Sequence, residues 1–343
     1  MSLAEKLLTR LSRPGGQLPD FIGARCLRRR FLRSGCDLCA RRCAAQAIFP
    51  GEGEVRIDEQ RCTGCLACTA ACPSEALVGR DSRPLKVWQQ ISSGELSAPV
   101  VLGCERSLRT GKELLLPCLG VLGREQLALF ALLSHSLILQ LYPCGKCHSP
   151  WVAELLASRR DELLDDWAGQ SAPTIELRLD PPAVVADPGA LAAVKPPGRR
   201  DFFRAFKTVS SQAAAETWWA FKDEPIRQEE HWASNKHLPN QLVMLRQVWE
   251  RLSGEQRQLL LPLLTVVEIG ESCTRCQACV GLCPSGAISG DDRDDDPPRL
   301  YFSWDRCSGC GLCREFCPAR AVTLRRPVKL EEVAADRREI NIP

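Results

Sequence analysis

The chain has 343 residues, with 45 Lys and Arg against 42 Asp and Glu, and a formal net charge of +3. That length is enough for two or three domains, and no apolar run approaches the length of about 18 residues that a membrane span needs. The chain is long and its 20 cysteines are grouped at metal-ligand spacing, which excludes the disulfide framework of a small secreted protein. Because these thiols must stay reduced until metal arrives, the composition predicts a cytoplasmic protein.

The N-terminal part of the chain gives no sign of an export signal. Residues 1–6 are amphipathic and lack the apolar region of a signal peptide. Two segments, 28–33 and 199–204, contain the arginine pair of an export signal, but polar residues follow each of them instead of an apolar stretch. We interpret both segments as basic helix faces or docking patches.

The first complete cysteine motif reads Cys62-x2-Cys65-x2-Cys68-x3-Cys72-Pro73. This is the spacing of bacterial ferredoxins, in which three cysteines bind one [4Fe-4S] cubane and the fourth binds a neighbouring cubane. The proline ends the ligand loop because it has no backbone N–H to donate. A short strand is predicted just before the motif, at 55–57, from its alternating side chains.

A degenerate motif, Cys36-x2-Cys39-x3-Cys43, lies upstream. Alanine followed by Ile, Leu or Val occupies the fourth and fifth positions after Cys43, and such a pair also follows the last cysteine of every complete motif. Cys43 is therefore a fourth-type cysteine. The first-type position then falls on Arg33, which cannot act as a thiolate ligand.

The nearest spare thiol is Cys26, which an inserted turn over 27–35 could bring into the site. We predict that Cys26 completes the cluster, because cubanes prefer four thiolates. The alternative is that Cys26 is a buried small hydrophobic residue, which leaves a [3Fe-4S] cluster or a cubane with a non-cysteine ligand. The predicted N-terminal ligand sets are Cys26, Cys36, Cys39 and Cys72 for one cubane and Cys62, Cys65, Cys68 and Cys43 for the other.

Residues 85–180 are predicted to form a small α/β domain. Apolar strands are expected at 99–102, 113–116, 137–141 and 175–179, with helices over 127–133 and 151–167. Strands that alternate with helices indicate a mainly parallel sheet. Four candidate metal ligands fall beyond strand ends, where such sheets place their ligands: Cys104, Cys118, Cys144 and Cys147.

The segment that carries these four cysteines resembles the delta subunit of methyl-viologen-reducing hydrogenases. The resemblance covers Leu102-Gly-Cys104, Pro117-Cys118-Leu-Gly120 and Cys144-Gly-Lys-Cys147-His148. It implies a four-cysteine [2Fe-2S] centre that passes electrons between a hydrogenase or formate dehydrogenase and heterodisulfide reductase. The chain has Arg106 and Ser107 where that family has a further cysteine.

Other chemistries fit the central cysteines as well. Zinc is the main alternative, because a C-x2-C pair serves either metal. A thioredoxin-type dithiol and c-type haem attachment at Cys144-x2-Cys147-His148 are also open, and His148 is not expected to be a ligand. Since this domain lies between the two cysteine-rich ends of the sequence, we expect a redox centre in it to lie between them in space.

Residues 181–262 are predicted to be a linker, rich in Pro, Gly and Ala over 181–200, followed by helices over 201–262. The acidic run 291–296 is expected to be a solvated loop. Tryptophans of the helical segment are expected to pack in the core or between domains: Trp218, Trp219, Trp232 and Trp249.

The C-terminal part holds two complete motifs, Cys273-x2-Cys276-x2-Cys279-x3-Cys283-Pro284 and Cys307-x2-Cys310-x2-Cys313-x3-Cys317-Pro318. A strand at 300–302 is predicted before the second. Paired zinc knuckles are the alternative, but eight cysteines in this order with two prolines favour cubanes. The predicted ligand sets are Cys273, Cys276, Cys279 and Cys317 for one cubane and Cys307, Cys310, Cys313 and Cys283 for the other.

The whole pattern predicts an α+β protein in which each cysteine-rich end resembles the bacterial dicluster ferredoxins. The expected domains are ferredoxin-like modules at 1–84 and 263–330, the α/β domain at 85–180, the linker and helical segment at 181–262, and a tail at 331–343. The resemblance implies four [4Fe-4S] clusters beside the central [2Fe-2S] or zinc site. Oxidised cubanes with four thiolates carry about −2 each, so the positive formal charge is no sign of nucleic acid binding.

No Gly-rich dinucleotide loop, P-loop or nucleophile–base pair is visible in the sequence. We therefore expect a non-catalytic, cytoplasmic electron-transfer subunit that relays electrons between a larger oxidoreductase, of the hydrogenase or formate dehydrogenase type, and an acceptor protein. The alternative is an accessory protein that matures a molybdenum or tungsten oxidoreductase, similar to the ferredoxin-like accessory proteins of periplasmic nitrate reductase. Those proteins carry Arg-Arg-x-[Phe/Leu]-[Phe/Leu] segments, as found here near Arg29 and Arg199.

Overall fold

The structure, a computed structural model, describes residues 18–107, 113–181, 236–291, 298–333, 337–340 and 342. Contacts divide the chain into one unit of Met1–Pro181 with Trp232–Pro343 and a second of Pro182–His231, and every described residue belongs to the first. Several sequence expectations fall outside the described residues: the amphipathic start, most of the linker, the basic segment 199–204, the helices before 236, the acidic run after Asp291, and Trp218, Trp219 and Trp232.

The two cysteine-rich ends have the same strand arrangement. In the N-terminal module, β1 (Asp20–Phe21) pairs antiparallel with β4 (Leu77–Val78), and β2 (Ile48–Pro50) forms a hairpin with β3 (Val55–Ile57). In the C-terminal module, β9 (Val266–Ile269) pairs with β12 (Val322–Arg325), and β10 (Ile288–Gly290) pairs with β11 (Leu300–Phe302). Each module is therefore closed by its first and last strands around an inner hairpin, and the predicted strands at 55–57 and 300–302 are confirmed.

Each motif contains one short helix that carries its third cysteine and ends one or two residues before its fourth. These helices are α3 (Leu38–Arg41), α4 (Ala67–Ala71), α11 (Ala278–Leu282) and α12 (Leu312–Phe316). They are too short to be stable alone, so the strand pairs and the neighbouring thiol sites must hold them. Arg338–Glu339, which the sequence assigns to the tail, forms β13 and adds a third strand beside β11.

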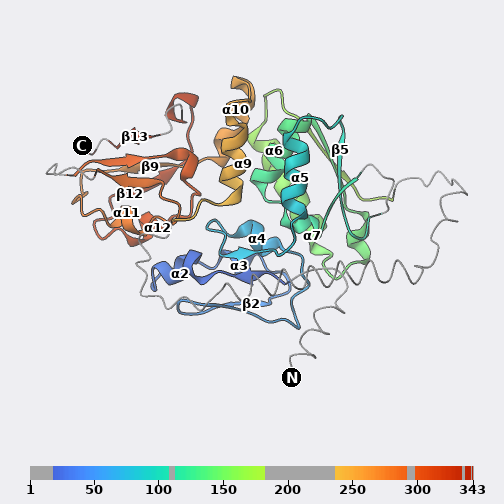
Figure 1. The fold of residues 1–343 in the computed structure, drawn as a ribbon, viewed down its shortest axis with the longest axis horizontal. Coiled ribbons are helices and arrows are strands. Elements are labelled where there is room, and N and C mark those ends of the chain that lie inside the picture. Colours follow the sequence, from blue (N-terminus) through green and yellow to red (C-terminus); the bar gives the residue numbers. More distant parts are fainter. Residues whose placement is uncertain are drawn as a thin grey trace, which may run out of the picture. The chain divides into compact units, whose positions relative to one another are not determined.

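Residues 85–180 contain the expected parallel sheet, with strand order β6-β5-β7-β8 and all three pairings parallel. Its strands are β5 (Val100–Cys104), β6 (Glu113–Leu116), β7 (Ser136–Gln140) and β8 (Thr174–Arg178), and its helices are α6 (Arg124–Ser134) and α7 (Trp151–Asp166). A helix that the sequence did not predict, α5 (Arg83–Ser92), packs beside α6 (Figure 1), with Trp88 stacked on Phe130 at 6.0 Å between ring centroids.

Helices α9 (Asn240–Trp249) and α10 (Gly254–Leu260) connect the central domain to the C-terminal module. The indole of Trp88 donates to Gln247 on α9 at 2.8 Å, and that of Trp167 donates to the carbonyl of Leu259 at 2.8 Å. Trp249 packs against Trp304 with ring centroids 4.5 Å apart, so the expected packing role is confirmed for this tryptophan. Across the described residues we find no helix both long and apolar enough to cross a membrane.

Candidate iron–sulfur sites

The four cysteines predicted for the first N-terminal cubane line one pocket: Cys26, Cys36, Cys39 and Cys72. Cys26 stands at the start of α2 (Leu27–Arg30) and is only 7% exposed. Burial raises the pKa of the Cys39 thiol to about 12, and the thiols of Cys72, Cys36 and Cys26 contribute to the same shift. The structure therefore brings Cys26 into this set, which we call the first N-terminal site, and its role as a ligand stays a prediction.

We call the set predicted for the other N-terminal cubane, Cys62, Cys65, Cys68 and Cys43, the second N-terminal site. Burial raises the pKa of the Cys68 thiol, and the thiols of Cys65, Cys62 and Cys43 raise it further. The Cys39 thiol of the first site adds a smaller contribution, so the two N-terminal sites are neighbours.

The eight C-terminal cysteines divide between two pockets as the spacing predicts. One pocket is lined by Cys273, Cys276, Cys279 and Cys317, which we call the outer site. The other is lined by Cys283, Cys307, Cys310 and Cys313, which we call the junction site. Burial raises the pKa of Cys313 to about 12, with Cys310, Cys283 and Cys279 contributing, and the contribution of Cys279 marks the two sites as neighbours.

One hydrogen bond recurs at all four fourth-type cysteines. The backbone N–H of the alanine four residues later donates to the cysteine sulfur, at 3.2 to 3.4 Å: Ala47 to Cys43, Ala76 to Cys72, Ala287 to Cys283 and Ala321 to Cys317. The residue before each alanine has a left-handed φ between 49° and 70°, which turns the alanine N–H back towards the sulfur. The repeated alanine of the sequence thus marks a donor that stabilises a thiolate and the cluster bound to it.

Residues with a left-handed backbone conformation also distinguish the complete motifs from the degenerate one. The residues on both sides of Cys65, Cys276 and Cys310 have positive φ, whereas Asp37, after Cys36, has φ −136°. A tight loop wraps the first three thiolates only in the complete motifs. In the degenerate motif, the inserted helix α2 lies between Cys26 and Cys36, and Cys26 lines the pocket that also holds Cys36, Cys39 and Cys72.

The four central cysteines also come together, although they lie on three separate stretches of chain. Cys104 ends β5, Cys118 follows β6, and Cys144 and Cys147 lie in and after the short helix Tyr142–Lys146. Burial raises the pKa of Cys118 to about 12 and that of Cys144 to about 11, with Cys104 contributing to both shifts and Cys147 to the second. His148 is exposed.

Ser107 is a polar group of the central site that the sequence singled out only as a departure from the hydrogenase delta subunit. Its side chain is 6% exposed, and its hydroxyl oxygen accepts from the backbone N–H of Cys104 at 3.0 Å. The hydroxyl also lies 3.9 Å from the Cys104 sulfur, to which it donates. Ser107 therefore holds the backbone of Cys104 and donates to its sulfur.

The central site lies against the second N-terminal site. Cys65 is among the thiols that raise the pKa of Cys118. The loop after Cys118 approaches so closely that a Cβ on Gly120 would lie 2.4 Å from the carbonyl oxygen of Cys65. The hydroxyls of Ser149 and Thr63 are hydrogen-bonded at 2.8 Å.

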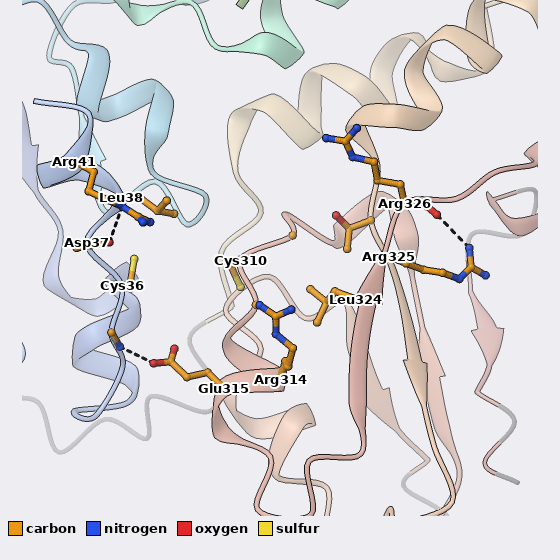
Figure 2. A pocket seen from close by; sticks show the side chains of 14 residues that line it. Cys36, Asp37, Leu38, Arg41, Cys310, Arg314, Glu315, Leu324, Arg325 and Arg326 are labelled. Carbon is orange, nitrogen blue, oxygen red and sulfur yellow. Dashed lines mark hydrogen bonds and ion pairs between the residues drawn. The ribbon is translucent and has the colours of Figure 1, made fainter. Parts of the chain in front are cut away.

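The two modules meet directly at Cys36 and Cys310. Burial raises the pKa of Cys310 to about 11, and Cys36 is one of the smaller contributors. The two cysteines line opposite sides of a cavity of about 460 Å³ (Figure 2). Across the cavity rim, the Glu315 carboxylate accepts from the Ser34 hydroxyl at 2.9 Å and from the Gly35 N–H at 2.5 Å. The two modules are therefore in direct contact here, although the central site was expected to lie between them.

The donor sets fit clusters bound by thiolates. Desolvated thiols with raised pKa values hold their protons, and bound metal would replace those protons. Within the ranges that the structure covers, no three Cys, His, Asp or Glu side chains converge on the geometry of a single metal ion. A cubane needs a wider cage than a single ion does, because each of its four thiolates binds a different iron.

Two segments of the chain, residues 33–76 and 272–321, match the family described as 4Fe-4S dicluster domain. The chain carries two such domains. The first match starts at Arg33, so Cys26 lies outside it, and the central domain lies outside both. No solved structure matches the chain.

Curated relatives match the chain over short stretches. The pyruvate synthase subunit PorD of Methanocaldococcus jannaschii is 36% identical over 59 residues, which are 17% of this chain and 64% of that protein. The archaeal-type glutamate synthase [NADPH] of Thermotoga maritima is 39% identical over 54 residues, 16% of this chain and 10% of that protein. The ferredoxin-type protein NapF of Haemophilus influenzae is 30% identical over 69 residues, 19% of this chain and 39% of that protein. These matches support an iron–sulfur electron-transfer function.

Proposed function

We propose that the protein is a cytoplasmic relay that carries single electrons through four [4Fe-4S] clusters and a central [2Fe-2S] cluster. It would connect a larger oxidoreductase, of the hydrogenase or formate dehydrogenase type, to an acceptor protein. Bound clusters would take up and release electrons without any bond being broken in the protein. The polypeptide would hold the sites close together and set their potentials.

The observation that carries the proposal is the unbroken succession of thiol sites. Neighbouring sites adjoin one another in order. The loop after Cys118 packs against the Cys65 carbonyl, and Cys36 and Cys310 line one cavity. Cys39 contributes to the raised pKa of Cys68, and Cys279 contributes to that of Cys313. The order is central site, second N-terminal site, first N-terminal site, junction site and outer site. Such a succession gives an electron one continuous route between the central domain and the outer site.

The relay is tested by EPR spectroscopy of the anaerobically purified full chain during stepwise reduction. We expect about sixteen iron atoms in cubanes, and broadened signals at full reduction because neighbouring reduced clusters interact magnetically. Four sharp and mutually independent signals would overturn the relay. Markedly less cubane iron would count against the N-terminal ligand sets.

A maturation role is the second candidate, and the similarity to the ferredoxin-type protein NapF favours it. Affinity purification of the tagged chain from its native cells distinguishes the two roles. A relay subunit is recovered in constant proportion to its oxidoreductase. A maturation factor is recovered with that enzyme only before the enzyme has acquired its cofactor.

A further inference from the structure

Lys236, which lies outside both cysteine motifs of the C-terminal module, is anchored at the junction site. Its ammonium group donates to the carbonyl oxygens of Val280, Gly281 and Cys283 at 2.8, 2.7 and 2.9 Å. These carbonyls lie at the C-terminal end of α11. Cys283 follows that helix directly, and its sulfur accepts from the backbone N–H of Ala287. Burial lowers the pKa of Lys236, and the Cys283 thiol opposes that shift. A positive charge is therefore fixed beside one ligand of the junction site.

Arg30 brings a second cation to the same site from the N-terminal module. It is the last residue of α2 and is 7% exposed. Leu27 of α2 packs with Leu282 and Leu312 in one apolar cluster, and the ring of Phe31 meets that of Phe316 at 5.0 Å between centroids. This packing holds Arg30 next to the junction site. Burial lowers its pKa, and the thiols of Cys283 and Cys310 oppose that shift.

The two cations act on the same ligand from different parts of the chain. Reduction adds one negative charge to a cluster, and a fixed positive charge nearby stabilises the reduced form most strongly where water is excluded. The buried acid Asp305, two residues before Cys307, does not cancel this effect, because it is paired with Arg246 at 2.9 Å.

We propose that Lys236 and Arg30 are positioning residues that raise the reduction potential of the junction site, so that an electron arriving from either module is held at their boundary. This inference rests on the proposed function only in requiring that the cubane be bound. It implies that removing either charge lowers the potential of the junction site more than that of the other three cubanes. It also explains why a cation from the N-terminal module is buried against the C-terminal one.

The test is a mediated redox titration of the purified full chain, followed by EPR, with the variants Lys236→Gln, Lys236→Arg and Arg30→Met. Glutamine keeps an N–H donor for the carbonyls but removes the charge. We expect Lys236→Gln and Arg30→Met together to lower the ratio of reduced to oxidised junction cluster about tenfold at a fixed potential, which for one electron is a shift of about 59 mV. Lys236→Arg keeps the positive charge, so its junction cluster should have the same potential as that of the parent.

A matched control is Arg25→Met, because Arg25 lies near Cys72 and donates to the carbonyl of Glu75 at 3.5 Å. It should shift the first N-terminal site and leave the junction site unchanged. The junction signal is assigned with Cys310→Ser, in which an oxygen ligand changes the spectrum. If that variant does not bind its cluster, the signal that is missing from its spectrum identifies the junction cluster.

Iron content equal to that of the parent shows that each variant is folded and loaded. An unchanged junction potential, or an equal shift of all four cubanes, would overturn the inference. Because the titration uses mediators and no protein partner, a shifted potential supports the inference even if the relay fails, and an unshifted one refutes it even if the relay holds.

Discussion

Gly120 offers the sharpest test of how the central domain is seated on the N-terminal module. A Cβ at this position would lie 2.4 Å from the carbonyl oxygen of Cys65, where contacts below 3.0 Å do not occur in real proteins, so the backbone must move by about 0.6 Å or more. The buried Arg159 resists this movement, because it donates to the carbonyls of Gly120 and Leu122. We therefore expect Gly120→Ala to cost about 1–3 kcal/mol as an overpacked contact, reduced by the roughly 0.4–1 kcal/mol that Gly→Ala usually gains through the unfolded chain.

The measurement is the midpoint of anaerobic thermal unfolding, followed by circular dichroism and cluster absorbance. A net loss of about 1–2 kcal/mol lowers that midpoint by roughly 2–8 °C in a domain of this size. The rate of backbone amide hydrogen exchange should increase in the loops around Cys65 and Gly120. Gly254→Ala is the matched control, since a Cβ there meets nothing within 4 Å, and it should be neutral or stabilising. A Gly120→Ala protein with the midpoint and exchange pattern of the parent would refute the close seating.

Three further predictions concern the cysteine sites. Cys26→Ser should make one N-terminal cubane labile or convert it to a [3Fe-4S] signal, and EPR and iron content equal to the parent would show that another group completes that site. A Cys144→Ala/Cys147→Ala double variant should lose a [2Fe-2S] spectrum and stall electron flow through the purified complex while the four cubanes remain; loss of zinc with unchanged electron transfer would contradict the relay role of the central site. Cys276 is the only one of the 20 cysteines that is exposed, so limited air oxidation should damage the outer site first. EPR during timed exposure checks this order, and earlier loss of the junction site, where Cys283 and Cys313 are buried, would disagree with it.

Motif spacing predicted which cysteines group together in the first N-terminal, outer and junction sites, and each of these three sets lines one pocket. The two-residue and three-residue gaps act through the covalent chain, and the alanine four residues after each last cysteine fixes the register of even the degenerate motif. The alternation of strands and helices likewise predicted the parallel sheet of the central domain. These features are local, so spacing and periodicity were enough to predict them.

The inserted residues between Cys26 and Cys36 show where local reasoning ends. The sequence explained the missing first-type cysteine at Arg33 by an inserted turn but gave no reason for the insertion. In the structure the insertion contains α2, whose Leu27 packs against Leu282 and Leu312 of the other module. The insertion therefore contacts the other module, in addition to the ligand role that we predict for the cysteines around it.

The order of the sites and the charges around them follow from contacts between residues that are far apart in the sequence. Lys236 reaches the carbonyl of a residue 47 positions later, and Glu315 accepts from a residue 281 positions earlier. Such pairings depend on how the apolar faces of separate elements pack, and no periodic pattern in the sequence predicts them. For the same reason the central site, placed between the modules by chain order, lies instead beside Cys65 at one end of the succession.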